Sequence, residues 1–389
     1  MKNRSIVMKN KHPFTKMIAI LVVIILICIG IILWKEITQD TVVFHEQIPI
    51  AQQEVLDNEE ETNHVIQNKQ SNLVQNTTQT ELVAPILGTV ESPNIQENGN
   101  EKVQIGYFYT QLDGNAKKIY EAVMQHKEDM KTGNYKITLG DTFQAVLKTD
   151  GGEQILQQAY QDAWDAIMTD FVDLFYLDTS KIYLFINSTK LWNIVNYEVS
   201  IGPEEGKNYY AVGYNNKQEV ENAIYQLETI KAGCISKATG TAYQKIMQVN
   251  DWLVDAISYD QSLNRTNTRN IYGAFIEKQV VCEGYAKAFQ YIMEGLEIPC
   301  VLVSGTASNS SGETEAHLWN YVKIDGNWYA VDVTWNDPII QGGGRLTNQM
   351  KHQYLCRGQS FLENHIPNGK VSQTGMTFMY PTLCVTDYR

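Results

Sequence analysis

Three short segments between residues 270 and 338 decide the expected fold: VCEGYA at 281–286, AHLWN at 316–320 and VDVTWNDP at 331–338. They supply a cysteine, a histidine and an aspartate in that order, namely Cys282, His317 and Asp332. The cysteine begins a helix-like pattern, and the other two lie in alternating, strand-like runs. These residue types suit a thiol nucleophile, a base that accepts its proton and a carboxylate that orients the base.

Cys282 is expected in the first turn of a helix that ends near Gly295. From Tyr285 to Leu296, apolar residues recur at the spacing of one buried helical face. The unpaired N–H groups and the positive dipole end at a helix start favour a thiolate and can hold an oxyanion. Gly284 leaves room for substrate or backbone near the sulfur. Taken alone, Cys282 is better explained as a small buried core residue, the usual place of a free cysteine.

A β-hairpin is expected to carry the histidine and the aspartate. Residues 317–324 and 328–335 alternate between apolar and polar types, and Asp-Gly at 325–326 between them is a strong hairpin signal. A two-residue loop makes His317 and Asp332 diagonal neighbours on one face, about 7–8 Å apart at the backbone. We therefore expect a hydrogen bond between them, which a one-residue slip in register would abolish. Considered singly, each has a structural alternative, a satisfied core histidine and a strand-end carboxylate.

The segments Cys-x-Gly-Tyr-Ala, His-x-Trp-Asn and Asp-Val-Thr-Trp resemble the core of the transglutaminase-like superfamily, a papain-related fold of thiol enzymes. The resemblance covers residues 240–340. It implies an α+β fold in which the Cys-bearing helix packs on an antiparallel sheet. It also implies Cys282 as nucleophile, His317 as general base and acid, and Asp332 as the orienting group.

The superfamily includes cross-linking transglutaminases, peptidases, deglycosylating amidases and members with no known activity. The resemblance therefore implies a cysteine-dependent hydrolase or acyltransferase acting on amide bonds, with a protein or peptide as substrate. Gly284, Trp319 and Trp335 are the candidate substrate-binding residues, although both tryptophans could equally fill the core. A catalytically idle binding or scaffold module at the cell envelope is the alternative.

No cofactor or metal is expected. The sequence has no Cys-x-x-Cys, His-Glu-x-x-His, Gly-x-Ser-x-Gly or phosphate-loop motif, and its tail histidines, His352 and His365, lack paired spacing. A weaker hypothesis makes Cys282, His317 and Asp332 metal ligands and predicts sensitivity to chelators. The net charge of −13 disfavours nucleic acid as a partner.

A membrane anchor is expected at residues 17–34, an uncharged apolar run long enough to cross a bilayer core. Basic residues precede it, so residues 1–16 are expected in the cytoplasm and the remainder outside the cell. We interpret the run as a single-pass signal anchor that contacts the lipid bilayer. A cleaved signal peptide and a lipid attached to Cys28 are the alternatives.

The rest of the chain divides by composition. Residues 35–100 are polar and acidic and are expected to form a disordered stalk. Residues 101–240 read as a helix-rich covering region that helps to shape the substrate cleft. Residues 241–389 read as the core with its C-terminal tail. The six cysteines are expected to be mostly free thiols.

Overall fold

The structure, a computed structural model, describes residues 37–45, 95–98, 101–262, 264–339 and 345–389. The apolar run at 17–34 lies outside these residues. Across the described part of the chain, no helix combines the length and apolarity needed to span a bilayer. Two pieces of the predicted stalk are strands instead, β1 (Ile37–His45) and β2 (Ile95–Asn98). The β-branched run at 41–43 suits a strand, and this local preference is lost in the average polarity of the segment.

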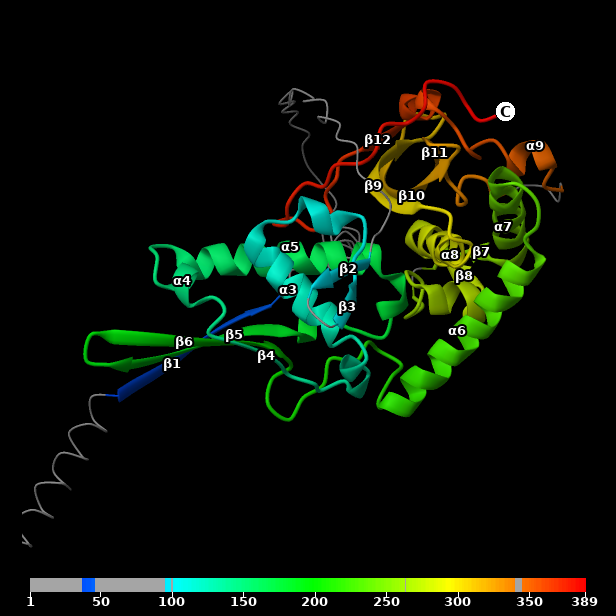
Figure 1. Cartoon of the computed structure of the whole chain (residues 1–389). Coiled ribbons are helices and arrows are strands. Elements are labelled where there is room, and N and C mark those ends of the chain that lie inside the picture. Colours follow the sequence, from blue (N-terminus) through cyan, green and yellow to red (C-terminus); the bar gives the residue numbers. More distant parts are fainter. Residues whose placement is uncertain (1–36, 46–94, 99–100, 263, 340–344) are drawn as a thin grey trace, which may run out of the picture.

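The N-terminal half of the described chain combines helices with a four-stranded antiparallel sheet in the order β1-β5-β6-β4 (Figure 1). The sequence analysis did not predict β1 as part of a sheet, because residues 37–45 belong to the expected stalk. The elements of this half are β3 (Glu101–Gln104), α3 (Gly114–Gln125), β4 (Ile137–Gly140), α4 (Gln144–Leu147), α5 (Gly152–Asp170), β5 (Tyr183–Leu191) and β6 (Ile194–Gly202).

The C-terminal half places helices against a second antiparallel sheet, with strand order β11-β10-β9-β12. Its elements are α6 (Lys217–Lys237), α7 (Ala242–Ala256), β7 (Ser258–Tyr259), β8 (Gln279–Val280), α8 (Cys282–Gly295), β9 (Cys300–Ser308), β10 (Thr314–Ile324), β11 (Asn327–Val331), α9 (Asn348–Lys351) and β12 (His365–Pro367). The central helix α8 lies against the sheet, where Asn320 Nδ2 donates to the Ala286 carbonyl at 3.1 Å. The Cys-bearing helix on an antiparallel sheet, as the resemblance implied, is thus present.

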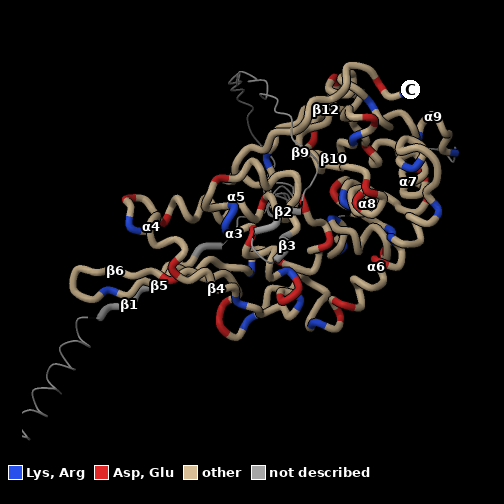
Figure 2. The backbone as a smooth tube through the Cα atoms, viewed as in Figure 1, with Lys and Arg blue, Asp and Glu red and all other residues tan. Residues whose placement is uncertain are grey.

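The C-terminal segment ties the two halves together (red in Figure 1). Ser372 Oγ donates to Asp165 Oδ2 on α5 at 2.6 Å. The Gln111 side chain bonds both to the Met379 carbonyl, at 3.0 Å, and to its N–H, at 2.8 Å. Figure 2 shows basic and acidic positions interspersed along the described backbone. The halves therefore share one packed body, and its surface charges are mixed.

Candidate active site

The cysteine sits at the start of α8, as its sequence pattern predicts. The residue before it, Val281, is extended, with φ −92° and ψ −176°, and its side chain makes no capping hydrogen bond. Val281 N–H bonds to the Thr268 carbonyl at 2.9 Å, which fixes the chain as it enters the helix. The N-cap side chain thus leaves the first N–H groups of α8 uncapped, so they remain able to stabilise negative charge near Cys282.

The neighbours of Cys282 on α8 have packing and charge roles. A Cβ at Gly284 would lie 2.4 Å from Val280 Cβ, so glycine lets α8 pack against its own entry strand. This contact gives a packing reason for glycine at position 284. The buried Glu283 carboxylate pairs with Lys287 at 2.6 Å and Arg269 at 3.3 Å. Burial opposes ionisation of Glu283, yet these two cations hold its pKa below the usual range.

The histidine and the aspartate meet as the hairpin register predicts. Strands β10 and β11 pair with Ile324 opposite Asn327 and Asn320 opposite Val331, and the turn residues Asp325 and Gly326 have φ of 49° and 83°. His317 Nε2 lies 2.8 Å from Asp332 Oδ2.

One detail of the structure differs from the predicted hairpin: the alternating pattern continues to residue 335, but β11 ends at Val331. The chain turns at Asp332 because its N–H bonds to the Tyr354 carbonyl, at 3.0 Å.

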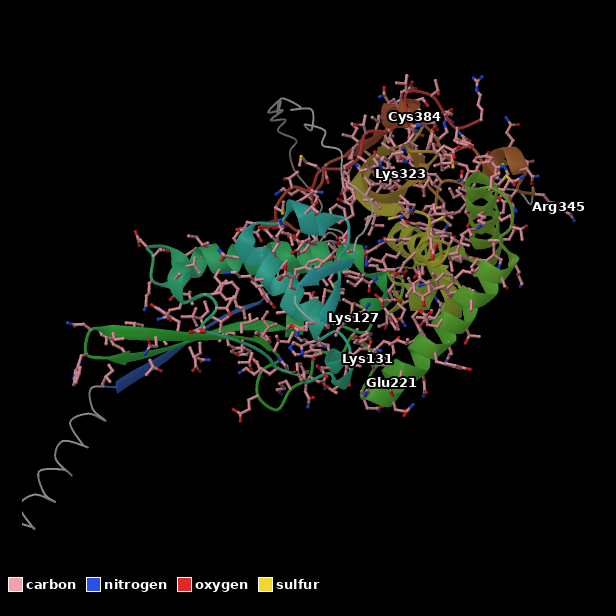
Figure 3. The ribbon with its side chains drawn as sticks, viewed as in Figure 1. Lys127, Lys131, Glu221, Lys323, Arg345 and Cys384 are labelled. Carbon is pink, nitrogen blue, oxygen red and sulfur yellow. The ribbon has the colours of Figure 1, made fainter. Side chains whose placement is uncertain are left out.

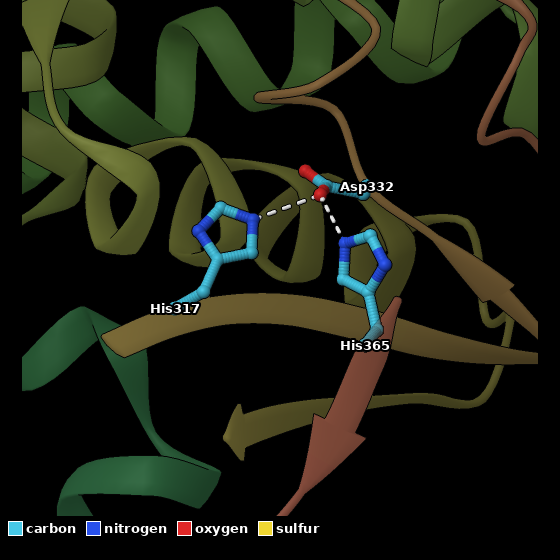
Figure 4. A group of neighbouring side chains, drawn as sticks. All are labelled: His317, Asp332 and His365. Carbon is cyan, nitrogen blue, oxygen red and sulfur yellow. Dashed lines mark hydrogen bonds and ion pairs between the residues drawn. The ribbon is translucent and has the colours of Figure 1, made fainter. Parts of the chain in front are cut away.

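Asp332 is held by three donors. Its Oδ1 accepts the Trp335 N–H at 3.0 Å. Its Oδ2 lies 2.8 Å from His317 Nε2 and 3.0 Å from His365 Nε2, as Figure 4 shows. His365 comes from β12, the strand that pairs with β9 on the other side of the sheet. Sequence reasoning missed His365 as a site residue, because nothing in its local spacing reveals that β12 returns beside Asp332.

The two histidines differ in charge state. Burial disfavours a charged imidazole at His317, but the Asp332 carboxylate and a hydrogen bond with Cys282 outweigh it and raise its pKa well above the ordinary value. Burial dominates at His365 and lowers its pKa. The pKa of Asp332 is held well below its usual range by both histidines, despite burial. Since His317 uses Nε2 for Asp332, its Nδ1 is the atom left for Cys282.

The His317–Asp332–His365 group has the residue types of a metal site, with ligand atoms all within 4.8 Å of one another. A metal ligand, however, must be an unprotonated imidazole nitrogen. Both Nε2 atoms instead lie at hydrogen-bonding distance from one carboxylate oxygen, to which a protonated nitrogen donates. A hydrogen-bonded network therefore fits these residues better than a metal centre.

The two tryptophans are placed differently. Trp319 is 1% exposed and packs edge-on against His365, with ring centroids 5.2 Å apart, so it fills the core. Trp335 is half-buried and lies 5.7 Å from the His317 ring, which keeps it a candidate contact for substrate.

A cavity of about 80 Å³ borders His317. Its wall includes Met168 on α5 and Tyr380 in the C-terminal segment, so parts of the chain outside the sheet and α8 contribute to it.

The structure thus brings a cysteine at a helix start and a histidine–aspartate pair on an antiparallel sheet together in one α+β domain. Residues 228–333 match the family model of the transglutaminase-like superfamily, and this domain belongs to that superfamily. The match begins within α6, which packs on α8 where Tyr291 Oη donates to Glu228 at 2.6 Å.

Two curated relatives are kyphoscoliosis peptidases. The chain is 24% identical to that of Mus musculus over 140 residues, covering 33% of this chain and 21% of the relative. It is 25% identical to that of Homo sapiens over 146 residues, covering 33% and 22%. The match thus spans about a fifth of the relatives' length.

Solved structures with some likeness include a TGase, with TM-score 0.27, 13% identity, and coverage of 40% of this chain and 45% of that one. Another is the periplasmic domain of TgpA from Pseudomonas aeruginosa bound to ethylmercury, with TM-score 0.24 and 13% identity. That likeness covers 40% of this chain and 72% of the other.

Proposed function

We propose that the protein is a thiol enzyme that acts on amide bonds through Cys282, His317 and Asp332. The observation that carries this proposal is the placement of the His317 imidazole, which bonds to Cys282 on one side and to the buried Asp332 carboxylate on the other. A protonated imidazole in that position stabilises a thiolate at the start of α8.

The proposed reaction follows from these positions. The Cys282 sulfur attacks the carbonyl carbon, and the Cys282 N–H helps to hold the negative oxygen that forms. His317 gives its proton to the leaving nitrogen as the C–N bond breaks, which releases ammonia or an amine and leaves an acyl thioester. Water or an amine then attacks the thioester carbon while His317 takes up the proton of that nucleophile, the C–S bond breaks, and Cys282 leaves as the thiolate paired with protonated His317. Both outcomes, hydrolysis and acyl transfer, use the same three residues.

The substrate class that we propose is a protein or peptide. The superfamily includes peptidases and transglutaminases, and the relatives named above are called peptidases. The half-buried Trp335 and the cavity beside His317 are the surfaces on which such a substrate would lie. Filling that cavity with Met168→Trp should raise KM more than it lowers kcat, because Met168 contacts the cavity and not the reacting atoms.

We also propose that residues 17–34 tether the chain in the cell membrane with the thiol site outside. The uncharged apolar run with basic residues before it supports this placement. Membrane fractionation and added protease test it: the full chain should sediment with membranes, and its C-terminal domain should be digested on intact cells. Recovery of the full chain in the soluble fraction would refute the tether.

The enzymatic proposal is tested with the full chain and its Cys282→Ala form. Each is given a glutamine-containing peptide mixture and a fluorescent primary amine, while ammonia release, label incorporation and peptide cleavage are followed. The wild-type chain should produce at least one of these signals and Cys282→Ala none. Equal signals from the two forms would refute the proposal.

An idle scaffold is the second candidate, and one observation favours it. Cys282 is 9% exposed and His317 is 2% exposed, so the reacting atoms are largely covered. A scaffold predicts a native thiol that resists alkylation at every pH, whereas an enzyme needs a reactive one.

A further inference from the structure

A second cavity, of about 270 Å³, lies on the far part of α8 from the thiol. It is bounded by the segment after β3, the end of α5, the second half of α8 and the start of β9. Its α8 residues, Gln290 and Glu294, are eight and twelve positions beyond Cys282, which is about 12–18 Å along a helix. The cavity is therefore separate from the proposed catalytic site.

The charged residue that α5 contributes to this cavity is the half-buried Asp170, at the end of the helix. Its carboxylate accepts the Phe108 N–H, at 3.2 and 3.3 Å, and the Tyr120 hydroxyl, at 3.0 Å. Gly106 packs so closely that a Cβ there would lie 2.0 Å from Asp170 Cγ. In the described part of the chain, Asp170 has no ion pair with a basic side chain. Burial raises its pKa to about 7, against the hydrogen bonds that favour the charged form.

The remaining lining adds acceptors and aromatic faces. The other charged lining residues are acidic, Glu294 and Glu297, and Lys231 pairs only with the first, at 3.1 Å. Gln290 is 8% exposed; its Nε2 donates to the carbonyls of Thr169, at 3.1 Å, and Asp170, at 3.3 Å. Those two acceptors fix the amide orientation, and its Oε1 has no hydrogen-bond partner in the described chain. The aromatic lining residues are Tyr107, Phe171 and Trp328.

This combination selects a ligand class. A half-buried carboxylate without a cation attracts positive charge, and a buried carbonyl oxygen without a donor is costly unless something supplies an N–H group. Aromatic walls favour an organic cation over a hydrated metal ion, because ring faces attract ammonium groups and apolar chains. We propose that this cavity binds a primary ammonium group on a slender alkyl chain, either a free alkylamine or the side chain of a lysine. The ammonium group pairs with Asp170, and its alkyl chain lies between the rings.

The proposal is tested by calorimetric titration of the full chain in its Cys282→Ala form, at pH 8. The probes are n-butylammonium chloride, Nα-acetyl-lysine methylamide and neutral n-butanol. The first two differ in source, so butylammonium binding indicates a small-amine site, and binding of the lysine derivative alone indicates a site for a protein side chain. In both cases the ammonium probe that binds should have an affinity at least tenfold higher than that of n-butanol. Failure of both ammonium probes to exceed n-butanol would overturn the proposal.

Two variants locate the site. Asp170→Asn keeps an oxygen for Phe108 and Tyr120 but removes the charge, so ammonium affinity should fall at least tenfold. Asp173→Asn is the matched control, because Asp173 lies three positions further on and pairs with Lys127, labelled in Figure 3, at 2.5 Å. It should bind as the parent does. Equal affinity in all three forms would refute the assignment to Asp170.

A measurement without a variant covers the case in which Asp170→Asn does not fold. Ammonium binding at pH 6 should release a proton from Asp170, so the heat should depend on the buffer at pH 6 and not at pH 9. The titratable groups that face Asp170 are Tyr120 on α3 and Tyr107, and burial raises the pKa of both hydroxyls, so neither loses a proton at pH 6. Glu294 on α8 lines the same cavity. Buffer-independent heat at both pH values would contradict the proposal.

Discussion

His317 and His365 direct their Nε2 atoms at one and the same carboxylate oxygen, from distances of 2.8 and 3.0 Å. Against burial, Asp332 and Cys282 raise the pKa of His317, whereas burial lowers the pKa of His365. His365 therefore acts on Asp332 as a neutral hydrogen-bond donor.

Removing that donor should weaken the fold. His365→Phe keeps a ring against Phe361, whose ring centroid lies 3.9 Å away, but leaves Asp332 one hydrogen bond short. A hydrogen bond to a charged group contributes about 1.5–3 kcal/mol, so the free energy of unfolding should drop by about that amount. His365→Asn retains an N–H group and is the control. Urea unfolding of both variants measures the difference, and equal stability would show that the bond contributes nothing.

The pKa of His317 gives stability a defined pH dependence. Its folded-state pKa is above the unfolded value of about 6.5, so its contribution is complete below that pH. It is lost as pH rises through the folded value. The difference in unfolding free energy between wild type and His317→Asn should therefore shrink between pH 6.5 and alkaline pH. A difference that stays constant or grows over this range would contradict the ion pair.

Asp332→Asn should separate the roles of the two carboxylate oxygens. The amide still accepts the Trp335 N–H, but it no longer stabilises a charged His317. In an analogous triad this change costs about four powers of ten, so a loss of roughly 10²–10⁴-fold in turnover is expected. Turnover is measured as ammonia or amine release across pH. Retention of wild-type rates would remove Asp332 from the proposed mechanism.

The hairpin turn sets the register on which the site depends. Gly326 has a φ of 83°, and no atom lies within 4 Å of the position that a Cβ would take, so only backbone conformation restricts the residue. Gly326→Val should lower stability by about 1–2 kcal/mol, because a β-branched residue resists positive φ. Gly326→Asn tolerates that conformation and should cost less. Thermal unfolding of the two variants decides, and the reverse order would contradict this account of the turn.

Short-range patterns predicted the elements that carry the proposed chemistry. The helix start at Cys282 is a local signal, and so is the Asp-Gly turn. The turn and the alternating runs beside it were sufficient to predict the bond between His317 and Asp332. The end of β11 at Val331 was missed, because it depends on a hydrogen bond from Asp332 N–H to Tyr354, 22 residues away in the chain. His365 was missed for the same reason, since its place beside Asp332 follows from the pairing of β12 with β9.

The N-terminal half shows the same limit. Helix α5 ends at Asp170, where the following Phe171 leaves helical geometry, with φ −120° and ψ 83°, although apolar residues continue beyond it. Burial of Phe171 and Leu174 in the core explains why the apolar pattern continues past the helix. Strand β1 was hidden in a polar segment because its pairing partner, β5, lies far along the chain.

The central claim is that His317 keeps Cys282 reactive as a thiolate, and the pH profile of alkylation tests it most directly. The full chain and its His317→Asn form are treated with iodoacetamide from pH 5 to 10, and modification of Cys282 is followed by peptide mass spectrometry. The account predicts that wild-type Cys282 reacts at a plateau rate well below pH 8, and that His317→Asn reacts appreciably only near pH 8.5 and above, as a free thiol does. Identical profiles for the two forms, or a Cys282 that stays unmodified at every pH while the chain is folded, would contradict it.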